Sequence, residues 1–376
     1  MQHRSDQIHI LSASRLVEEK WVDILIDAIE YISSRSDVRD RVFWTICSDG
    51  LREPEIRTLV QKYPKRVSYR GKISSSELRK LYMSHDFLFM PSRFLETFGL
   101  TALEALSVGT PVIGFRKGGL IPFIPESLVL DPTDPIGSLI DIIQSFIETR
   151  SRELTDVSDF SLESWRSRML ELLWPSERVL LIHDYSDLIG GAEYYLNFVQ
   201  KELRSSWKQA EIFAYTWKTT PWKRRWMFIA SIFAYSRGRE LRRVLNTEKP
   251  DGIWMHSILR YIGPWGVRAV KQYVEKYPNT QVYLSHHDLG LIAAFPQSIT
   301  EESQIPLGRG IFAFIPRELS LFRMIMSIGK WCYKEIVLSL LAKSTKHIIF
   351  SPFLEKHIQN HFPASETLLF PHTIQD

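Results

Sequence analysis

Residues 86–115 read DFLFMPSRFLETFGLTALEALSVGTPVIGF, and this stretch predicts a strand, a helix and a second strand. Its two ends are apolar runs of strand length, while leucines recur at helical spacing from Leu100 to Leu106. We expect the helix to run from Thr97 to about Ser107. Because a helix between two strands is the unit of a parallel sheet, the stretch predicts an α/β fold.

The same alternation extends along the whole chain and restarts once. With 376 residues, the chain is too long for a single ordinary core. One series of strands and helices fills the first half, and after WPSE at 174–177 a new apolar strand opens a second series. We therefore expect two doubly wound domains, 1–160 and 177–376, with a crossover helix and connection at 161–176.

Composition and charge limit the class of protein. A content of 44% hydrophobic and 24% charged residues is typical of a globular chain. The net charge of +4 favours an anionic ligand but is too small to indicate a nucleic-acid partner. Cys47 and Cys332 predict no disulfide framework, and the N-terminal sequence lacks the apolar core of a secretory signal. A cytoplasmic location therefore fits best.

Glu96 and Glu104 stand eight positions apart in the opening stretch. If the helix begins at Thr97, they lie ~12 Å apart along its axis. The carboxylates of a retaining glycosidase stand only ~5–5.5 Å apart, and those of an inverting one ~6.5–9.5 Å. The spacing therefore suits two contacts on one extended ligand, with a phosphate near the helix N-terminus. In the alternative reading, one acid starts the helix and the other lies on a solvated face.

Two cations follow the first predicted strand, 8–14. Arg15 and Lys20 lie in SRLVEEK, at the carboxyl end of that strand, where open α/β sheets bind their ligands. An arginine binds a phosphate through two donors and a lysine adds a point charge. The alternative is a pair of surface cations beside Glu18 and Glu19.

These elements occur in the order of a known family. SRLVEEK at 14–20, SDG at 48–50 and VSYRGKISSSELRKLYMSHDFLFMPSRFLETFGLTALEALSVGTPVIGFRKGG at 67–119 resemble the donor-nucleotide domain of family 4 retaining glycosyltransferases. The resemblance spans roughly 8–173. It implies a GT-B fold, in which two Rossmann-like doubly wound domains face each other across a cleft. It also implies a nucleotide diphosphate sugar as donor, no metal and no other cofactor.

The resemblance implies donor contacts for several residues of the first half. They are Arg15 and Lys20 at the diphosphate, Glu96 at the sugar, Glu104 at the ribose, the backbone of Phe98, Gly99 and Leu100 at the phosphates, and Gly71 and Lys72 at the base. The sequence departs from the family at Trp21, where a glycine is usual. It departs again after Gly118-Gly119, where the usual glutamate is missing. These departures motivate an alternative function, a catalytically weak nucleotide-sugar-binding protein.

The second half resembles the acceptor domain of the same family. RVLLIHDYSDLIGGAEYYLNFVQ at 178–200 contains Gly190 and Gly191, whose backbone would approach the donor phosphates. VYLSHHDLG at 282–290 resembles the strand whose histidine lies near the reacting sugar. We assign that role to His287, with His286 as the alternative. A histidine satisfied by the core is the structural explanation of either residue.

The acceptor half follows the donor half here, whereas the family has the reverse order. We interpret the chain as a circular permutant, and a cut from two tandem enzymes is the competing interpretation. The predicted activity is retaining transfer of a sugar to a hydroxyl of a glycan, lipid-linked or protein-linked acceptor. PWKRRWMFIASIFAYSRGRELRRVL at 221–245 could lie on an anionic membrane, giving a peripheral contact, or could pack on the core with a solvated basic face.

Overall fold

The computed structural model forms two compact units. Its described residues are 7–17, 20, 22–92, 94–173, 176–184, 191–206, 208–214, 235–256, 258–259, 262–287, 289, 293, 299, 302–305, 321–341, 343–363 and 365–373. The first unit comprises Met1–Leu162, Gln297–Glu302 and His372–Asp376, and the second comprises Glu163–Pro296 and Ser303–Pro371. Two short segments that the sequence analysis placed in the second domain therefore cluster with the first.

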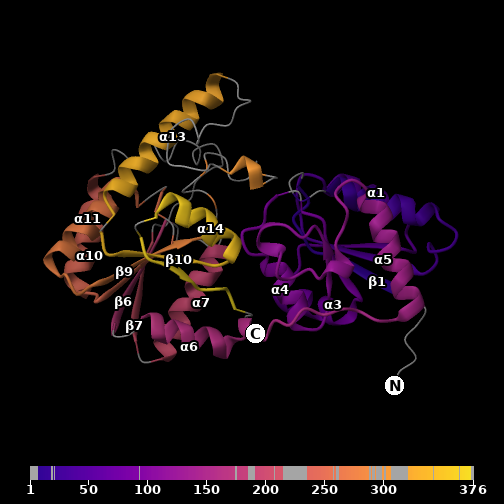
Figure 1. Ribbon diagram of the computed structural model, residues 1–376, viewed down its shortest axis with the longest axis horizontal. Coiled ribbons are helices and arrows are strands. Elements are labelled where there is room, and N and C mark those ends of the chain that lie inside the picture. Colours follow the sequence, from indigo (N-terminus) through magenta and orange to yellow (C-terminus); the bar gives the residue numbers. More distant parts are fainter. Residues whose placement is uncertain are drawn as a thin grey trace. The chain divides into compact units, whose positions relative to one another are not determined.

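The first unit contains a parallel five-stranded sheet with the order β3-β2-β1-β4-β5 (Figure 1). Its strands are β1 (Ile8–Ser12), β2 (Val42–Cys47), β3 (Val67–Gly71), β4 (Phe87–Met90) and β5 (Val112–Gly114). The central strand β1 pairs with β2 from Ile8↔Val42 onward and with β4 at Ile10↔Phe87. The order reverses direction between β1 and β4, and a crevice opens at such a switch point in open α/β sheets.

Helices connect these strands, as the sequence pattern predicts. They are α1 (Val22–Ser34), α2 (Glu53–Lys62), α3 (Ser75–Ser84), α4 (Leu100–Ser107) and α5 (Pro135–Thr149), with short 3-10 turns η2 (Gly118–Leu120), η3 (Glu126–Leu128) and η4 (Ser158–Phe160). In α1 the apolar positions from Leu25 to Ile32 repeat at helical spacing and are buried against the core. The predicted strand–helix–strand unit of the opening stretch is therefore present as β4, α4 and β5.

Helices α3 and α4 begin in different ways, and the predicted start of α4 at Thr97 is wrong by three residues. The N-cap of α3 is Ser74, whose hydroxyl accepts the N–H of Glu77 while the Glu77 carboxylate accepts the N–H of Ser74. Helix α4 begins at Leu100 because Gly99 adopts the left-handed conformation, with φ 96°. Glu96 therefore lies before the helix and not in its first turn, and the ~12 Å spacing that assumed a helix from Thr97 does not apply.

The second unit contains a parallel six-stranded sheet with the order β11-β10-β9-β8-β6-β7. Its strands are β6 (Arg178–His183), β7 (Gln209–Ala214), β8 (Gly252–Met255), β9 (Gln281–His286), β10 (Thr345–Ile349) and β11 (Thr367–Leu369). The remaining helices are α6 (Leu162–Leu172), α7 (Gly191–Ser205), α10 (Tyr235–Glu248), α11 (Gly263–Lys276), η6 (Glu302–Gln304), α13 (Leu321–Ser339) and α14 (Pro352–His361). Trp254 of β8 is fully buried at the centre of this sheet.

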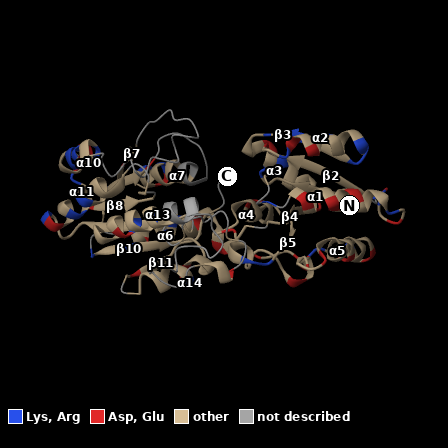
Figure 2. Ribbon diagram, turned by 90° about the horizontal axis from the view of Figure 1, so that it is seen from above, with Lys and Arg blue, Asp and Glu red and all other residues tan. Residues whose placement is uncertain are grey.

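Helix α10 carries part of the basic segment 221–245, and Figure 2 shows its arginines in blue. Gly238 and Leu241 on its apolar face are buried, and a Cβ atom on Gly238 would lie 2.8 Å from the backbone of Trp265 in α11. The apolar face of α10 is therefore covered by protein, which favours the core-packing interpretation for 235–245. Residues 221–234 lie outside the described residues. Among the described helices, none is both long and apolar enough to cross a membrane.

Candidate functional site at the carboxyl edge of the first sheet

The carboxyl ends of β1 and β4 lie side by side at the switch point of the first sheet. The loop after β1 carries Arg15 and Lys20, and the loop after β4 carries Ser92 and Glu96. The parallel pairing of the two strands brings these loops to the same edge, although 76 residues separate Lys20 from Glu96. The structure therefore joins two of the residues that the sequence analysis assigned to one ligand.

Glu96 is held through one of its two carboxylate oxygens. Lys20 Nζ forms an ion pair with Glu96 Oε1, and the hydroxyl of Ser92 donates to the same oxygen at 2.9 Å. The side chains of Lys20 and Glu96 are 15% and 13% exposed. The ammonium group also lies 5.6 Å from the ring centroid of Phe94, within cation–π range. Among the described residues, Glu96 Oε2 has no hydrogen-bond partner, so this oxygen can accept a bond from a ligand.

The Gly118-Gly119 pair supports the backbone of the same segment. The N–H of Gly119 donates to the carbonyl of Glu96 at 2.6 Å. A Cβ atom on Gly118, which has φ 58°, would lie 2.7 Å from that carbonyl oxygen, and one on Gly119 would lie 2.5 Å from the nitrogen of Phe98. Only glycine permits this approach at both positions. The turn after β5, which lacks the family's usual glutamate, therefore contacts the Glu96 segment through its backbone.

The loop that carries Arg15 is fixed by the turn after β2. Leu16 is buried, its N–H donates to Asp49 O at 2.9 Å, and its carbonyl accepts the N–H of Arg52 at 3.0 Å. Gly50 approaches so closely that a Cβ atom there would lie 2.2 Å from Leu16 O. Arg15 itself is exposed. The SDG turn thus supports the backbone beside a cation that remains accessible to a ligand.

Gly71 and Lys72 lie at the carboxyl end of β3, on the same edge of the sheet. Gly71 has φ 65°, and its carbonyl accepts the N–H of Ser48 at 2.7 Å. Lys72 is exposed. Both residues therefore follow the strand where the sequence analysis placed the base of the nucleotide.

At the start of α4, the Phe98 side chain packs in the core, whereas Gly99 and Leu100 form the N-terminus of the helix. Phe98 is buried, with ring centroids of Phe123 at 5.4 Å and His372 at 5.0 Å. Burial lowers the pKa of His372 to about 3. Gly99 is the N-cap of α4, and its carbonyl accepts the N–H groups of Ala102 at 3.0 Å and Leu103 at 3.1 Å. The N–H groups nearest the start of a helix have no partner in the preceding turn, so the contact of this end with a phosphate stays a prediction.

Glu104 lies within α4, on an accessible face. Its Oε2 accepts a hydrogen bond from the hydroxyl of Tyr82 at 3.3 Å, and Tyr82 is buried. Desolvation by the surrounding atoms raises the pKa of Glu104 above its ordinary value. Among the described residues no hydrogen bond or ion pair joins Glu104 to Glu96 or to Lys20. The structure therefore places Glu104 apart from the ion pair.

The sequence analysis missed Ser92. The signal that could have identified it is its place directly after the buried strand β4, since polar residues at the carboxyl end of a parallel strand face the crevice. Trp21 and Gly190 lie outside the described residues, and Gly191 is the first residue of α7.

In the second unit the two candidate histidines have different surroundings. His287 follows the carboxyl end of β9, is half-buried, and lies with Nε2 3.2 Å from His256 Nδ1 and its ring stacked on Phe350 at 4.7 Å. His286 is buried, with Nε2 2.8 Å from His347 Nδ1. Burial lowers the pKa of His286 well below its ordinary value. The geometry therefore favours His287 over His286 as a residue that a ligand could reach.

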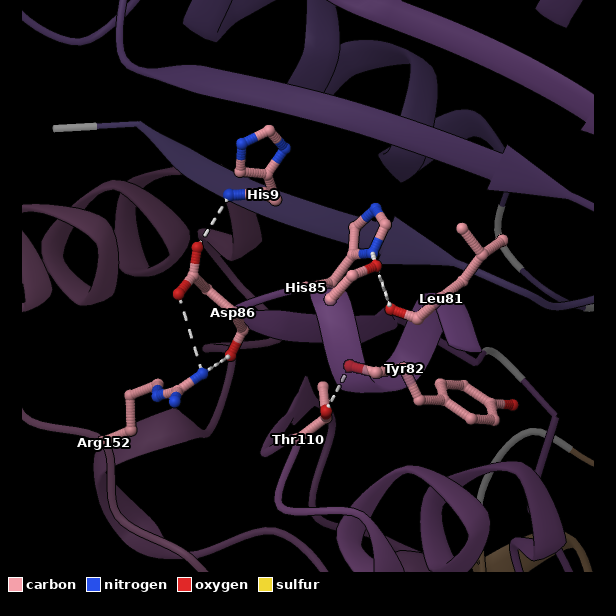
Figure 3. Close-up of polar contacts among 8 residues, drawn as sticks. His9, Leu81, Tyr82, His85, Asp86, Thr110 and Arg152 are labelled. Carbon is pink, nitrogen blue, oxygen red and sulfur yellow. Dashed lines mark hydrogen bonds and ion pairs between the residues drawn. The ribbon is translucent and has the colours of Figure 1, made fainter. Parts of the chain in front are cut away.

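At the opposite edge of the first sheet, several polar side chains bond to the backbone (Figure 3). Asp86 Oδ2 accepts the N–H of His9 at 2.9 Å, and Arg152 donates to the Asp86 carbonyl at 3.1 Å. His85 Nδ1 lies 2.6 Å from Leu81 O. A cavity of about 380 Å³ adjoins these residues. Because these polar groups are already paired with the backbone, we interpret this edge as structural.

Comparisons with known proteins concern mainly the first unit. Residues 7–148 match the family model described as glycosyl transferases group 1. The mannosylfructose-phosphate synthase of Agrobacterium fabrum is 28% identical over 152 residues, which cover 38% of this chain and 33% of that protein. The D-inositol 3-phosphate glycosyltransferase of Paenarthrobacter aurescens is 28% identical over 192 residues, which cover 46% of this chain and 47% of that protein. The first unit is thus similar to group 1 glycosyltransferases.

The similarity covers only part of each protein. The chain spans about a third to a half of the length of these curated relatives. A solved structure of Anabaena HepE in complex with UDP-glucose is 23% identical, covers 38% of this chain and 40% of that one, and gives a TM-score of 0.33. A TM-score of this size does not establish a shared fold for the whole chain.

Proposed function

We propose that the protein is a retaining glycosyltransferase of family 4 that moves a sugar from a nucleotide diphosphate sugar to a hydroxyl acceptor. The observation that carries the proposal is the Lys20–Glu96 pair at the switch point between β1 and β4. It lies within residues 7–148, the part that matches the glycosyl transferases group 1 model. A cation for a diphosphate and a carboxylate for a sugar, held together, suit a ligand that carries both groups.

The chemistry follows from charge that develops on the leaving group. As the bond between the anomeric carbon and the diphosphate oxygen breaks, negative charge grows on the diphosphate. Arg15, Lys20 and the N–H groups at the start of α4 would stabilise that charge in place of a metal ion. The acceptor oxygen bonds to the anomeric carbon on the face that the diphosphate leaves, and its proton passes to the departing diphosphate oxygen. Configuration is therefore retained.

The remaining assignments follow from the same proposal. Glu96 Oε2 would accept a hydroxyl of the donor sugar, Glu104 the ribose hydroxyls, and Gly71 and Lys72 would border the base. In the second unit, Gly190 and Gly191 would approach the phosphates and His287 would act near the reacting sugar. We propose a cytoplasmic enzyme whose acceptor is a glycan, a lipid-linked sugar or a glycoprotein, with a peripheral membrane contact.

We further propose that the two halves form a GT-B enzyme in circularly permuted order. What supports this order is the segment after β11, which packs on the first unit. The Thr373 hydroxyl donates to Phe160 O at 2.9 Å, and the ring of His372 contacts Phe98. A chain rearranged so that 177–376 precedes 1–173 should then keep donor turnover within about threefold. If both orders bind nucleotide and neither turns over a donor, the tandem-enzyme interpretation holds instead.

The central test separates binding from turnover. Calorimetry with UDP, GDP, ADP, UDP-glucose, GDP-mannose and ADP-glucose would identify the donor, and release of the nucleoside diphosphate would measure its hydrolysis. We expect Glu96→Ala to lower turnover about 100-fold or more while the affinity for the free nucleoside diphosphate changes less than about threefold. Glu30→Ala is the matched control, since Glu30 pairs with Lys62 on the exposed surface of α1.

The outcomes distinguish the candidate functions. A wild-type protein that binds none of the six nucleotides contradicts the proposal. One that binds a nucleotide sugar, yet neither hydrolyses it nor transfers it to glycan, lipid-linked or protein acceptors, supports the alternative of a nucleotide-sugar-binding protein. A transfer product whose anomeric configuration is opposite to that of the donor, as read by proton NMR, contradicts the retaining mechanism.

A further inference from the structure

We propose that Ser92 is a positioning residue for Glu96, and that its hydroxyl keeps the Glu96 carboxylate in place when a donor engages Lys20. This inference rests on the proposed function. Ser92 Oγ donates to Glu96 Oε1 at 2.9 Å, and Ser92 is 2% exposed. The hydroxyl is therefore shielded from water, and the carboxylate oxygen is its partner in the structure.

The backbone holds Ser92 rigidly. It lies two residues beyond the end of β4, and its N–H donates to the carbonyl of Met90, the last residue of that strand, at 3.0 Å. A serine side chain has one carbon between the backbone and the hydroxyl, so little freedom remains once the backbone is fixed. The position of the hydroxyl is therefore set by the sheet.

Lys20 offers a different kind of contact to the same oxygen. Its ammonium group stands on a flexible four-carbon chain and carries three N–H donors. A diphosphate bound at the carboxyl edge would compete with Glu96 for that ammonium group, because both are anions. Ser92 is neutral and buried, so the arrival of the diphosphate does not draw it away. The hydroxyl would then be the contact that still fixes Glu96 Oε1.

Holding Oε1 also determines the direction of Oε2. Two donors converge on one carboxylate oxygen, and the other oxygen has no partner among the described residues. Loss of the Ser92 hydroxyl would allow the carboxylate to rotate. A misplacement of about 1 Å can cost about 100-fold in rate. The sugar part of the donor would be affected, while the nucleotide part would not.

The test uses the full chain and compares each nucleoside diphosphate with its sugar. For wild type and Ser92→Ala, calorimetry gives the dissociation constants of UDP and UDP-glucose, and of GDP and GDP-mannose. Donor hydrolysis gives kcat and KM. We expect the affinity of Ser92→Ala for UDP or GDP to remain within about twofold, the affinity gained from the sugar to fall about 10-fold, and kcat to fall about 10- to 100-fold.

Two further variants separate positioning from a general loss of structure. Ser92→Thr keeps the hydroxyl and should restore kcat to within about threefold of wild type. Thr110→Val is the matched control, because it removes another buried hydroxyl of the same unit, one that donates to Tyr82 O at 2.6 Å and does not touch Glu96 (Figure 3). It should leave both dissociation constants and kcat unchanged, and circular dichroism would confirm that every variant is folded.

Each contrary outcome identifies what has failed. If wild type hydrolyses a donor and Ser92→Ala matches it in kcat and in the affinity for the sugar, the positioning role is wrong and the proposed function stands. The positioning role is also wrong if Ser92→Ala weakens UDP and UDP-glucose equally, since Ser92 would then act on the whole site. If wild type binds neither nucleotide nor nucleotide sugar, both the proposed function and the positioning role of Ser92 are wrong.

Discussion

Two ion pairs in the first unit are almost equally shielded from solvent and lie at opposite edges of one sheet. At the carboxyl edge the Lys20 and Glu96 side chains are 15% and 13% exposed, and at the amino edge those of Arg152 and Asp86 are 16% and 17% exposed. The two pairs differ in the groups that bond to their carboxylates. Asp86 also accepts the N–H of His9 in β1, and Arg152 also donates to the backbone of Asp86 (Figure 3). Among the described residues, the Glu96 carboxylate is held by the side chains of Lys20 and Ser92 alone.

The two pairs are therefore distinguished by the groups that anchor them and not by their burial. A pair bonded to the backbone of a strand cannot exchange its partner without disturbing the sheet. A pair held by two side chains, with one oxygen left open, can exchange a partner for a ligand at the cost of a local contact. We therefore expect mutations at the two edges to change different quantities.

The largest expected effect is on activity at the carboxyl edge. Lys20→Met removes the cation and should lower donor turnover about 100- to 1,000-fold, because the leaving diphosphate loses a charge-assisted contact. The free energy of unfolding should fall by only about 1–2 kcal/mol, since Ser92 still donates to Glu96. Donor hydrolysis and urea unfolding measure the two quantities. A large loss of stability with unchanged turnover would contradict the prediction and would show that the Lys20–Glu96 pair stabilises the fold.

The next effect is on stability at the amino edge. Asp86→Ala leaves the N–H of His9 without its acceptor and Arg152 without its counter-ion, and it should lower the free energy of unfolding by about 3 kcal/mol. Urea unfolding followed by circular dichroism measures the loss. At temperatures where the variant is folded, its affinity for the nucleotide should match wild type. A changed affinity would show that the two edges are coupled.

A smaller effect is expected where the glycine turn meets the Glu96 backbone. Gly118→Ala introduces a Cβ atom at φ 58° and 2.7 Å from Glu96 O. We expect a loss of about 1–2 kcal/mol in stability from the strained backbone. Turnover should fall as well, because the Glu96 segment must shift. Gly109→Ala is the matched control, since Gly109 also has positive φ but an added Cβ atom would meet nothing within 4 Å. It should cost stability without lowering turnover.

The smallest expected effect is a pH dependence at His85. Burial is the main cause that lowers the pKa of His85, with further lowering by His9 and Arg70, while the Leu81 carbonyl and Asp86 act in the opposite direction. The unfolded state, with a pKa near ~6.5, therefore binds the proton more readily than the folded state. This contribution to stability is present above ~pH 6.5 and is lost as the pH falls toward the folded value.

His85→Gln should reduce the loss of stability that accompanies a fall in pH below ~6.5. The measurement is the urea unfolding midpoint of wild type and variant across about pH 5 to 7.5. Other buried histidines with lowered pKa, including His347, whose pKa is about 4, contribute in the same direction in both proteins. The difference between the two curves therefore reports His85. Parallel curves would show that His85 does not contribute.

The sequence by itself determined the architecture. Apolar runs of strand length and leucines at helical spacing identified two α/β series, because burying those side chains is possible only in such a pattern. The resemblance of the motifs also predicted that Glu96 and Lys20 contact one ligand, and the structure shows the two side chains paired. The predicted helix start at Thr97 was wrong. Gly99 adopts the left-handed conformation, so the irregular segment continues through Gly99 and the helix begins at Leu100. A glycine permits that conformation without requiring it.

Only the tertiary structure decided how the site is held. The contact of Lys20 with Glu96 arises from the pairing of β1 with β4, and a linear pattern does not specify which strands become neighbours. The same holds for the Gly119 N–H on the Glu96 carbonyl and for the difference in exposure between His287 and His286. The hydrogen bond from the Ser92 hydroxyl to Glu96 Oε1 also emerged only from the structure. Hydrogen bonds between loops depend on distances that are fixed by packing of the whole sheet.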